Sequence, residues 1–131
     1  MKSIFSKVDC IRLYVPDLEK GYEFYHDKLW LELVWKTEKG MGFLFGDGVT
    51  ELVIQNEDRY QETDLKVESV KNTVKQIQQS GGKILKGPFD IKIGKCAVVE
   101  DPWGNKMVIL DSSKGTFVTD KKGNVVGQNK P

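Results

Sequence analysis

The sequence lacks the residues and patterns that mark several common classes of protein. Its 131 residues include one histidine and two cysteines. No segment approaches the roughly 18 consecutive apolar residues of a membrane-spanning helix, and the N-terminal stretch MKSIFSKVDCIRL has no apolar run typical of a signal peptide. We therefore expect a cytoplasmic protein with no membrane partner.

An excess of charge of one sign is also missing. The chain has 20 basic and 19 acidic side chains, a net charge of +1, and its lysines are spread along the sequence. Binding to nucleic acids or membrane surfaces depends on clustered basic residues, so neither partner is expected. Cys10 and Cys96 fall in predicted strands, and without an export signal we expect two reduced thiols instead of a disulfide.

Two hairpin-like stretches organise the sequence. In Ala97–Asp111, AVVEDPWGNKMVILD, two apolar runs flank a turn that contains Pro102 and Gly104. Gly42–Ile54 is a weaker version of the same pattern. The chain is therefore predicted to contain two copies of one unit.

The first unit is predicted to contain a strand, a helix and three further strands. Polar and apolar residues alternate in Val8–Val15, as they do in a half-buried strand. Asp17 is a suitable N-cap for a helix of about three turns with an apolar stripe. The stripe is Leu18, Tyr22, Tyr25 and Leu29, and the later strands are Leu31–Lys36, Met41–Gly46 and Val49–Gln55.

The same pattern returns after a shift of 52 residues, which supports a repeat. Asp17 then falls on Ser69, a second N-cap, and the second helix, Val70–Ser80, ends at a pair of glycines. The three later strands of this unit are Lys83–Lys86, Lys95–Val99 and Lys106–Leu110. The second unit needs about four additional residues, which we expect in a loop at Gly87–Gly94.

The unit order, the segment VPDLEKGYEFYHDKL, the helix ending in two glycines and the hairpin EDPWGNKMVIL together resemble one known superfamily. This is the glyoxalase, bleomycin-resistance and extradiol-dioxygenase superfamily, also called vicinal-oxygen-chelate proteins, and the resemblance covers residues 8–111. It implies an α+β fold of two βαβββ modules, about Val8–Gln55 and Thr63–Leu110, that form a curved-sheet cup. Members are often dimeric, and the enzymes among them hold a divalent metal on the cup floor.

Two parts of the chain depart from that pattern. Trp30 stands where the family usually has a glycine after the first helix. A bulky residue is strained in the left-handed conformation, so we expect this helix to end in a different way that avoids it. The domain is predicted to span residues 1–111, and residues 112–131 form a polar tail. In this tail Thr116–Thr119 and Asn124–Val126 fit either a small hairpin or a disordered segment.

The resemblance also assigns the family's metal-ligand positions. They fall on Cys10 and Glu62 in the first strand of each module and on Glu51 and Val108 in the last strands. Family enzymes carry His, Gln or Glu at these positions, so only Glu51 is an unaltered match. Arg12 should share the face of Cys10, and Asp64 the face of Glu62. The candidate ligand-binding residues are therefore Cys10, Arg12, Glu51, Glu62, Asp64 and Val108.

The donors at these positions restrict the chemistry. Extradiol dioxygenases and fosfomycin-type enzymes use histidine ligands. The one histidine, His26, lies on the first helix beside Asp27, as a surface residue would, so neither of these two activities is expected. Glyoxalase chemistry needs a metal and a carboxylate that moves a proton, which makes Glu51 the catalytic candidate if the protein is an enzyme. A thiol and two carboxylates combine ligands that soft and hard metals prefer, and they make a poor ligand set for either. No cofactor is therefore expected, although a divalent metal stays open as an alternative.

Simpler interpretations exist for each residue. Glu51 and Glu62 could be ordinary strand carboxylates in water, because a register error of one residue reverses the face. Cys10 could be a small core residue. Trp35, Phe43 and Phe45 could line an apolar wall, although aromatic residues at strand spacing usually belong to the core.

Three functions are compatible with the sequence. The first is metal-independent binding of a small organic molecule in the cup, as in bleomycin-resistance proteins. The second is a metal-dependent lyase or isomerase of glyoxalase type with altered ligands, and the third is a non-catalytic structural or regulatory dimer. A homodimer is expected because strand edges invite pairing with another chain. Arg12 is predicted to lie between Glu51 and Glu62, where the enzymes hold the metal.

Overall fold

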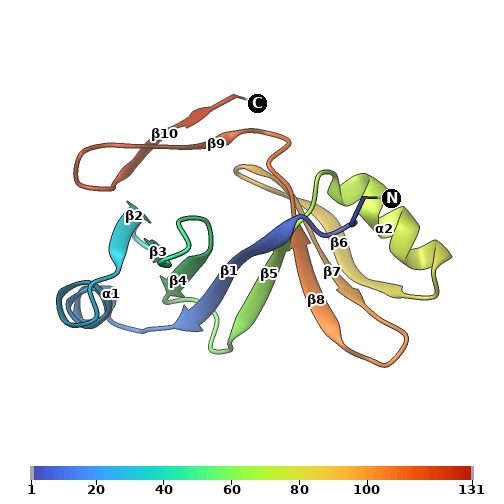
Figure 1. Cartoon of the computed structure of the whole chain (residues 1–131), viewed down its shortest axis with the longest axis horizontal. Coiled ribbons are helices and arrows are strands. Elements are labelled where there is room, and N and C mark those ends of the chain that lie inside the picture. Colours follow the sequence, from blue (N-terminus) through green and yellow to red (C-terminus); the bar gives the residue numbers. More distant parts are fainter. Residues whose placement is uncertain (1, 131) are drawn as a thin grey trace. The chain divides into compact units, whose positions relative to one another are not determined.

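The computed structural model describes residues 2–130 and shows ten strands and three helical segments within them (Figure 1). The chain divides into two compact units. The first contains Asp9–Glu62 together with Phe117–Gly127, and the second contains Thr63–Thr116 with short segments near both termini. Among the described residues, no helix is both long and apolar enough to cross a membrane.

The strands of the first unit lie in the order β2-β3-β4-β1. Strand β1 runs parallel to β4, and the other neighbours are antiparallel. The elements are β1 (Lys7–Tyr14), α1 (Leu18–Tyr22), a π-helix η1 (Glu23–Lys28), β2 (Glu32–Lys36), β3 (Gly40–Leu44) and β4 (Glu51–Gln55). Leu18, Tyr22 and Tyr25 pack against a buried cluster around Phe43 and Ile54, which confirms three members of the predicted stripe. The fourth member, Leu29, is 46% exposed and lies outside this cluster.

The second unit repeats this arrangement with the strand order β5-β8-β7-β6. Its elements are β5 (Glu62–Lys66), α2 (Val70–Gln79), β6 (Lys83–Ile91), β7 (Gly94–Glu100) and β8 (Lys106–Leu110). Ser69 caps α2, and the helix packs on β6 and β7 over a core that includes Val70, Val99 and Ile109. The predicted α+β class and the two βαβββ modules are therefore confirmed.

The end of the first helix differs from the prediction. The amide of Leu29 bonds to the carbonyl of Phe24, five residues earlier, so one extra residue is held in a π turn. The helix then ends with Trp30 at φ 63°, as the second helix ends with Gly81 at φ 99°. The expectation that Trp30 avoids the left-handed conformation is therefore wrong. Its side chain is 86% exposed.

The expected loop at Gly87–Gly94 is also wrong, because β6 continues to Ile91 and pairs with β7 along its length. The register of this hairpin shifts between Lys86 and Phe89, which is how the strand accommodates additional residues while it stays paired. The additional length of the second module therefore extends a hairpin.

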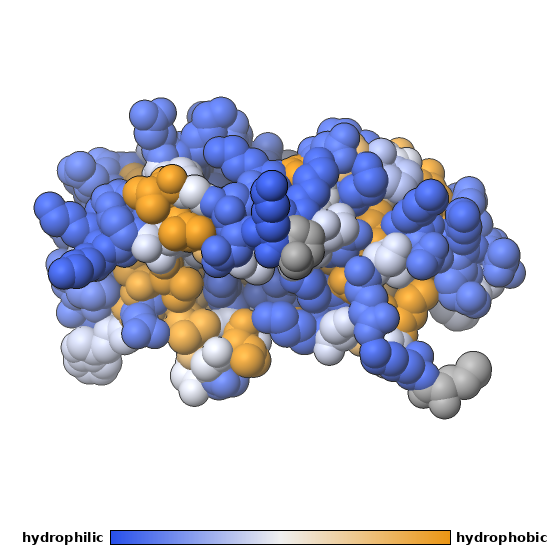
Figure 2. Space-filling model, turned by 90° about the horizontal axis from the view of Figure 1, so that it is seen from above, coloured by the Kyte–Doolittle hydropathy of each residue, from blue (hydrophilic) through white to orange (hydrophobic). Residues whose placement is uncertain are grey.

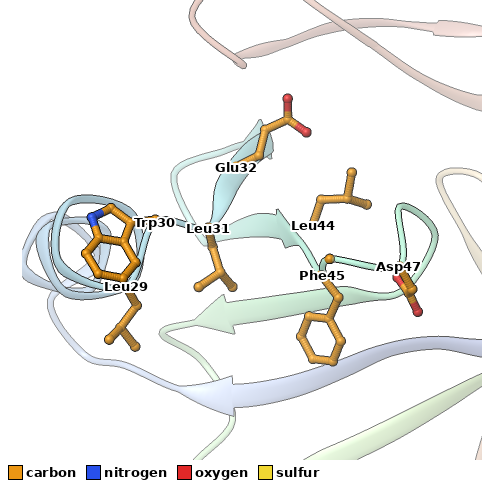
Figure 3. A pocket seen from close by; sticks show the side chains of 8 residues that line it. Leu29, Trp30, Leu31, Glu32, Leu44, Phe45 and Asp47 are labelled. Carbon is orange, nitrogen blue, oxygen red and sulfur yellow. The ribbon is translucent and has the colours of Figure 1, made fainter.

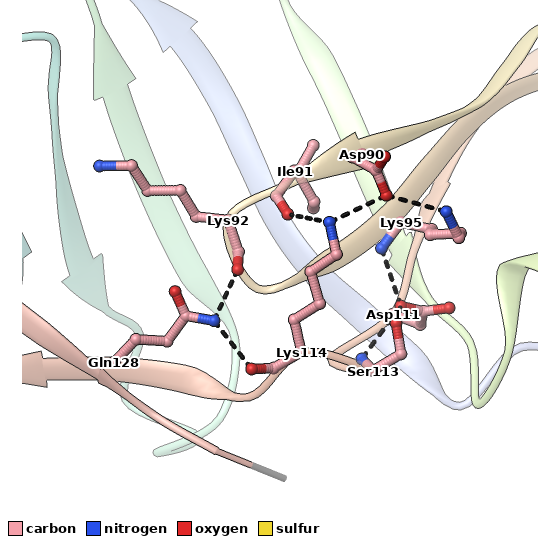
Figure 4. A network of polar contacts seen from close by, with 8 residues as sticks. All are labelled: Asp90, Ile91, Lys92, Lys95, Asp111, Ser113, Lys114 and Gln128. Atoms are coloured by element: carbon pink, nitrogen blue, oxygen red, sulfur yellow. Dashed lines mark hydrogen bonds and ion pairs between the residues drawn. The ribbon is translucent and has the colours of Figure 1, made fainter.

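Asp111, directly after β8, connects several backbone segments of the second unit (Figure 4). Its carboxylate accepts hydrogen bonds from the amides of Val70 (2.8 Å) and Lys95 (2.9 Å). It also accepts bonds from the amide and hydroxyl of Ser113 (3.1 and 2.7 Å). Burial raises the pKa of Asp111, but these four bonds outweigh it and hold the pKa below its usual value. Helix α2, β7 and the segment after β8 thus meet at one charged group.

The last two strands, β9 and β10, form a separate pair. Strand β9 (Thr116–Thr119) pairs with β10 (Val125–Asn129) in a two-stranded sheet. Between them, Asp120 accepts hydrogen bonds from the amides of Lys122 and Asn124, each 2.9 Å long. The tail of the chain is therefore a hairpin closed by an ordered turn.

Replacing Trp30 with glycine is expected to raise the free energy of unfolding by about 1 kcal/mol, because glycine adopts a positive φ without a Cβ clash. Gly81→Ala, at the corresponding helix end, is expected to lower it by a similar amount. Urea denaturation measures both. A Trp30→Gly variant that is less stable than wild type would show that the indole makes contacts worth more than the strain.

Asp111→Asn is expected to lower the free energy of unfolding by about 2 kcal/mol at pH 7. The Asn side chain is uncharged and has one acceptor oxygen, so it cannot replace the carboxylate in all four hydrogen bonds. The folded-state pKa is lowered, so this contribution is complete above the unfolded pKa of about 4 and declines as the pH falls. Wild type and variant should therefore converge in acid, as measured by urea denaturation from pH 7 to pH 3.

A matched control is Asp90→Asn. Hydrogen bonds from Lys114 and Lys95, each 2.8 Å, hold the pKa of the exposed Asp90 at about 2. Water screens the charges of this exposed cluster, so Asp90→Asn should change the free energy of unfolding less than Asp111→Asn does. The reverse order of effects would contradict the role given to Asp111.

Candidate functional site

Strands β1 and β4 place several polar side chains of the first unit on one face. Parallel pairing sets Cys10 beside Glu51 and Arg12 beside Val53. Leu52 and Ile54 pack into the helix-covered core, so the alternating residues of β4 point to the opposite side. We call this side the polar face, and it carries Cys10, Arg12, Glu51, Val53 and Gln55.

Trp35 holds the Glu51 carboxylate in place on the polar face. Its Nε1–H donates a hydrogen bond of 2.7 Å to Glu51 Oε1. The register of β2 shifts between Leu33 and Trp35, and glycine at position 42 leaves room for the indole. A Cβ at Gly42 would lie 2.0 Å from Nε1 of Trp35. The sequence indicates the aromatic residue but not this bond, since the β-bulge that directs it has no local signal.

Arg12 lies among carboxylates at the other end of the polar face. Its Nε atom is 3.5 Å from Glu62 Oε2, and its Nη2 atom is 3.8 Å from Asp58 Oδ2. The side chains of Arg12 and Glu62 are 28% and 21% exposed, so this is a partly buried and loosely paired cluster. Asp58 is a site residue that sequence reasoning missed, because it lies in a polar loop with no distinctive pattern.

Gln55 explains why that loop is ordered. It is 3% exposed, and its Oε1 atom accepts bonds from the amides of Glu57 and Asp58 at 2.8 and 2.7 Å. Its Nε2 atom donates to the carbonyl of Asp58 at 2.6 Å. One buried side chain thus fixes the backbone that carries Asp58 toward Arg12.

The other two predicted site residues belong to the second unit. Asp64 of β5 and Val108 of β8 are neighbours across a parallel strand pair. Asp64 is 6% exposed. Val108 has a hydrocarbon side chain and cannot be a metal ligand.

The donor set does not fit a divalent metal. Within residues 2–130, no three His, Cys, Asp or Glu side chains are grouped closely enough to hold an ion. Cys10 and Glu51 are neighbours, but a thiol and a carboxylate favour different metals. His26 stacks on Tyr22 with 4.4 Å between ring centroids and contacts Asp27, as expected for a residue on the helix surface.

An apolar groove is a second candidate site (Figure 3). Its volume is about 620 Å³, and it is lined by Leu29, Trp30, Leu31, Glu32, Leu44, Phe45, Gly46 and Asp47. Leu31 and Phe45 point to one side in Figure 3, whereas Glu32 and Leu44 point to the other. Asp47 accepts three hydrogen bonds within its own turn. Few polar groups therefore converge on the groove, and the polar face is the better candidate.

The exposed surface gives little further guidance. Seen from above, it is mostly hydrophilic, with apolar side chains in separate patches (Figure 2). Large apolar residues with high exposure include Trp30 and Trp103, at 86% and 84%. Scattered apolar residues of this kind are normal on soluble domains and do not define a site alone.

Comparison with protein families identifies the class. The model of the Glyoxalase/Bleomycin resistance protein/Dioxygenase superfamily matches residues 7–109. The chain belongs to this superfamily, as its repeat and motifs predicted. No curated protein sequence matches the chain.

Solved structures share the fold at low sequence identity. Methylmalonyl-CoA epimerase from Mycobacterium tuberculosis has a TM-score of 0.69 at 12% identity, over 85% of this chain and 91% of that one. A protein described as NAD-dependent benzaldehyde dehydrogenase from Legionella pneumophila has a TM-score of 0.64 at 20% identity, over 79% of this chain and 97% of that one. A variant of homoprotocatechuate 2,3-dioxygenase from B. fuscum has a TM-score of 0.56 at 20% identity, over 82% of this chain and 33% of that one. At these identities the similarity establishes the fold alone.

The Trp35–Glu51 bond should be measurable by a double-mutant cycle with Trp35→Phe and Glu51→Gln. We expect a coupling free energy of about 1 to 2 kcal/mol in urea denaturation, because the bond joins a partly buried donor to a charged acceptor. Trp103→Phe, at an exposed indole, is the control and should change stability by less than about 0.5 kcal/mol. A coupling near zero would contradict the role given to Trp35.

Proposed function

We propose that this protein binds a small organic molecule on the polar face and does so without a metal. The observation that carries the proposal is the position of Arg12, within 3.5 Å of Glu62 and 3.8 Å of Asp58. A guanidinium remains charged at all physiological pH values, so it supplies positive charge where the family's enzymes use a cation. Glu51 receives its own donor from Trp35.

The polar face offers groups that can orient a ligand. The Arg12 guanidinium can donate to carboxylate, phosphate or carbonyl oxygens, and its long ion pairs leave room for such a contact. Glu51 has further lone pairs for a hydroxyl or amine donor. Cys10 is 4% exposed and contributes mainly apolar surface. Asp64 and Val108 stay predicted ligand-binding residues on the family resemblance.

Binding is favoured over catalysis because the groups for bond activation are incomplete. A carboxylate such as Glu51 can take a proton, but lyase and isomerase chemistry of the glyoxalase type also polarises the substrate with a metal. Within the part of the chain that the structure describes, no three His, Cys, Asp or Glu side chains are grouped as ligands for such a metal, which supports binding over catalysis.

Two alternatives remain as outcomes of the test. A metal-dependent lyase or isomerase would draw on the neighbouring Cys10 and Glu51. A structural or regulatory dimer would need neither ligand nor metal, and a homodimer itself stays a prediction from the strand edges. Native mass spectrometry of protein purified without chelators distinguishes them: a bound small molecule supports the proposal, a bound metal supports the enzyme, and neither supports the dimer.

Manganese titration of Arg12→Ala tests the role of the guanidinium. Wild type should show no change in melting temperature with millimolar Mn²⁺, whereas the variant should gain about 3 °C, because its unneutralised carboxylates attract a cation. Without Mn²⁺ the variant should lose about 1 kcal/mol of stability, since the cluster is partly exposed.

The matched control is Arg59→Ala. Arg59 is the other arginine of the chain, and its guanidinium lies over the Tyr14 ring at 5.4 Å. Its removal should leave the response to Mn²⁺ as in wild type. Equal responses of Arg12→Ala and wild type would mean that Arg12 does not stand in for a metal.

A further inference from the structure

The tail hairpin places an aromatic ring against the polar face. Phe117 of β9 lies 5.8 Å from the ring of Trp35, centroid to centroid, with the planes inclined by 57°. Trp35 is the residue that donates to Glu51. Phe117 therefore packs beside the indole that binds Glu51.

The tip of the same hairpin attaches to the edge strand of the first unit. The amide of Lys36, at the end of β2, donates to the carbonyl of Gly123 at 2.7 Å. Lys36 and Asn124 also form a parallel bridge, and Gly123 packs against Leu33. The turn of the tail hairpin thus contacts the edge strand β2 through one isolated bridge, while β9 and β10 stay a separate two-stranded sheet.

The root of the hairpin is anchored in the second unit, where Gln128 Nε2 donates to the carbonyls of Lys92 (2.7 Å) and Lys114 (2.8 Å) (Figure 4). These bonds involve exposed groups. Every residue of β9 and β10 is exposed or only partly buried, and Val126 is 63% exposed. A two-stranded hairpin with so little buried surface has low stability of its own, so its contacts with the rest of the chain can open at low cost.

We propose that Phe117 occupies the place of a ligand's aromatic ring, and that the tail hairpin must leave Trp35 when this ligand binds. The inference rests on the proposed function and adds the ligand class, a flat aromatic ring with a polar substituent. Trp35 supplies the aromatic surface, and Glu51 accepts a bond from the substituent. The tail is then a competitor within the chain that weakens binding until it is displaced.

The test compares benzyl alcohol with cyclohexylmethanol, which has the same hydroxymethyl group on a saturated ring. Binding is followed by the Trp35 indole N–H signal in NMR spectra of the full chain, assigned with Trp35→Phe. We expect Phe117→Ala to bind benzyl alcohol at least fivefold more tightly than wild type, and Phe117→Leu to fall between them. Val126→Ala, in the same hairpin, should behave as wild type. Cyclohexylmethanol should bind each variant more weakly.

Displacement has a separate readout. Benzyl alcohol should shift the amide signals of Lys36 and Gly123 in wild type, because their hydrogen bond opens when the hairpin leaves. Equal binding by wild type and Phe117→Ala would overturn the inference while the proposed function stands. Binding by neither alcohol would also overturn it, and native mass spectrometry would then decide the proposed function separately.

Discussion

The parallel pairing of the first and last strand of each module is the constraint on which this structure depends. Parallel neighbours cannot be joined by a tight turn, so the chain must cross over, and here the crossover includes a helix. That helix covers one face of its strands and buries their apolar residues. In the first unit, the same register leaves Cys10, Arg12 and Glu51 together on the side that faces away from the helix. One pairing thus produces both a core and a candidate site.

The carboxylates at the polar face each lie beside a hydrogen-bond donor or a cation. Carboxylates that lose contact with water need a donor or a cation, or they take up protons. Glu51 receives an indole N–H, and Glu62 and Asp58 lie near a guanidinium. Both donors come from strands of the same unit, so they are present as soon as the sheet forms.

The repeat, the two helix caps and the helical stripe of Leu18, Tyr22 and Tyr25 were predictable because each follows a short-range rule. The contacts that complete the candidate site were not. Trp35 reaches Glu51 through a shift in strand register, Asp58 is carried by a loop that Gln55 fixes, and Phe117 arrives from a distant part of the chain. Such contacts depend on tertiary geometry, which has no counterpart in local spacing.

The π turn in the first helix has a consequence for how a duplicated module can change in length. An additional residue inside a strand moves every later side chain to the opposite face, which would exchange core and site. Held as a single wide turn before Leu29, the additional residue ends with the helix and adds no residue to a strand. The two halves of this chain can therefore differ in length while each keeps its inner and outer faces.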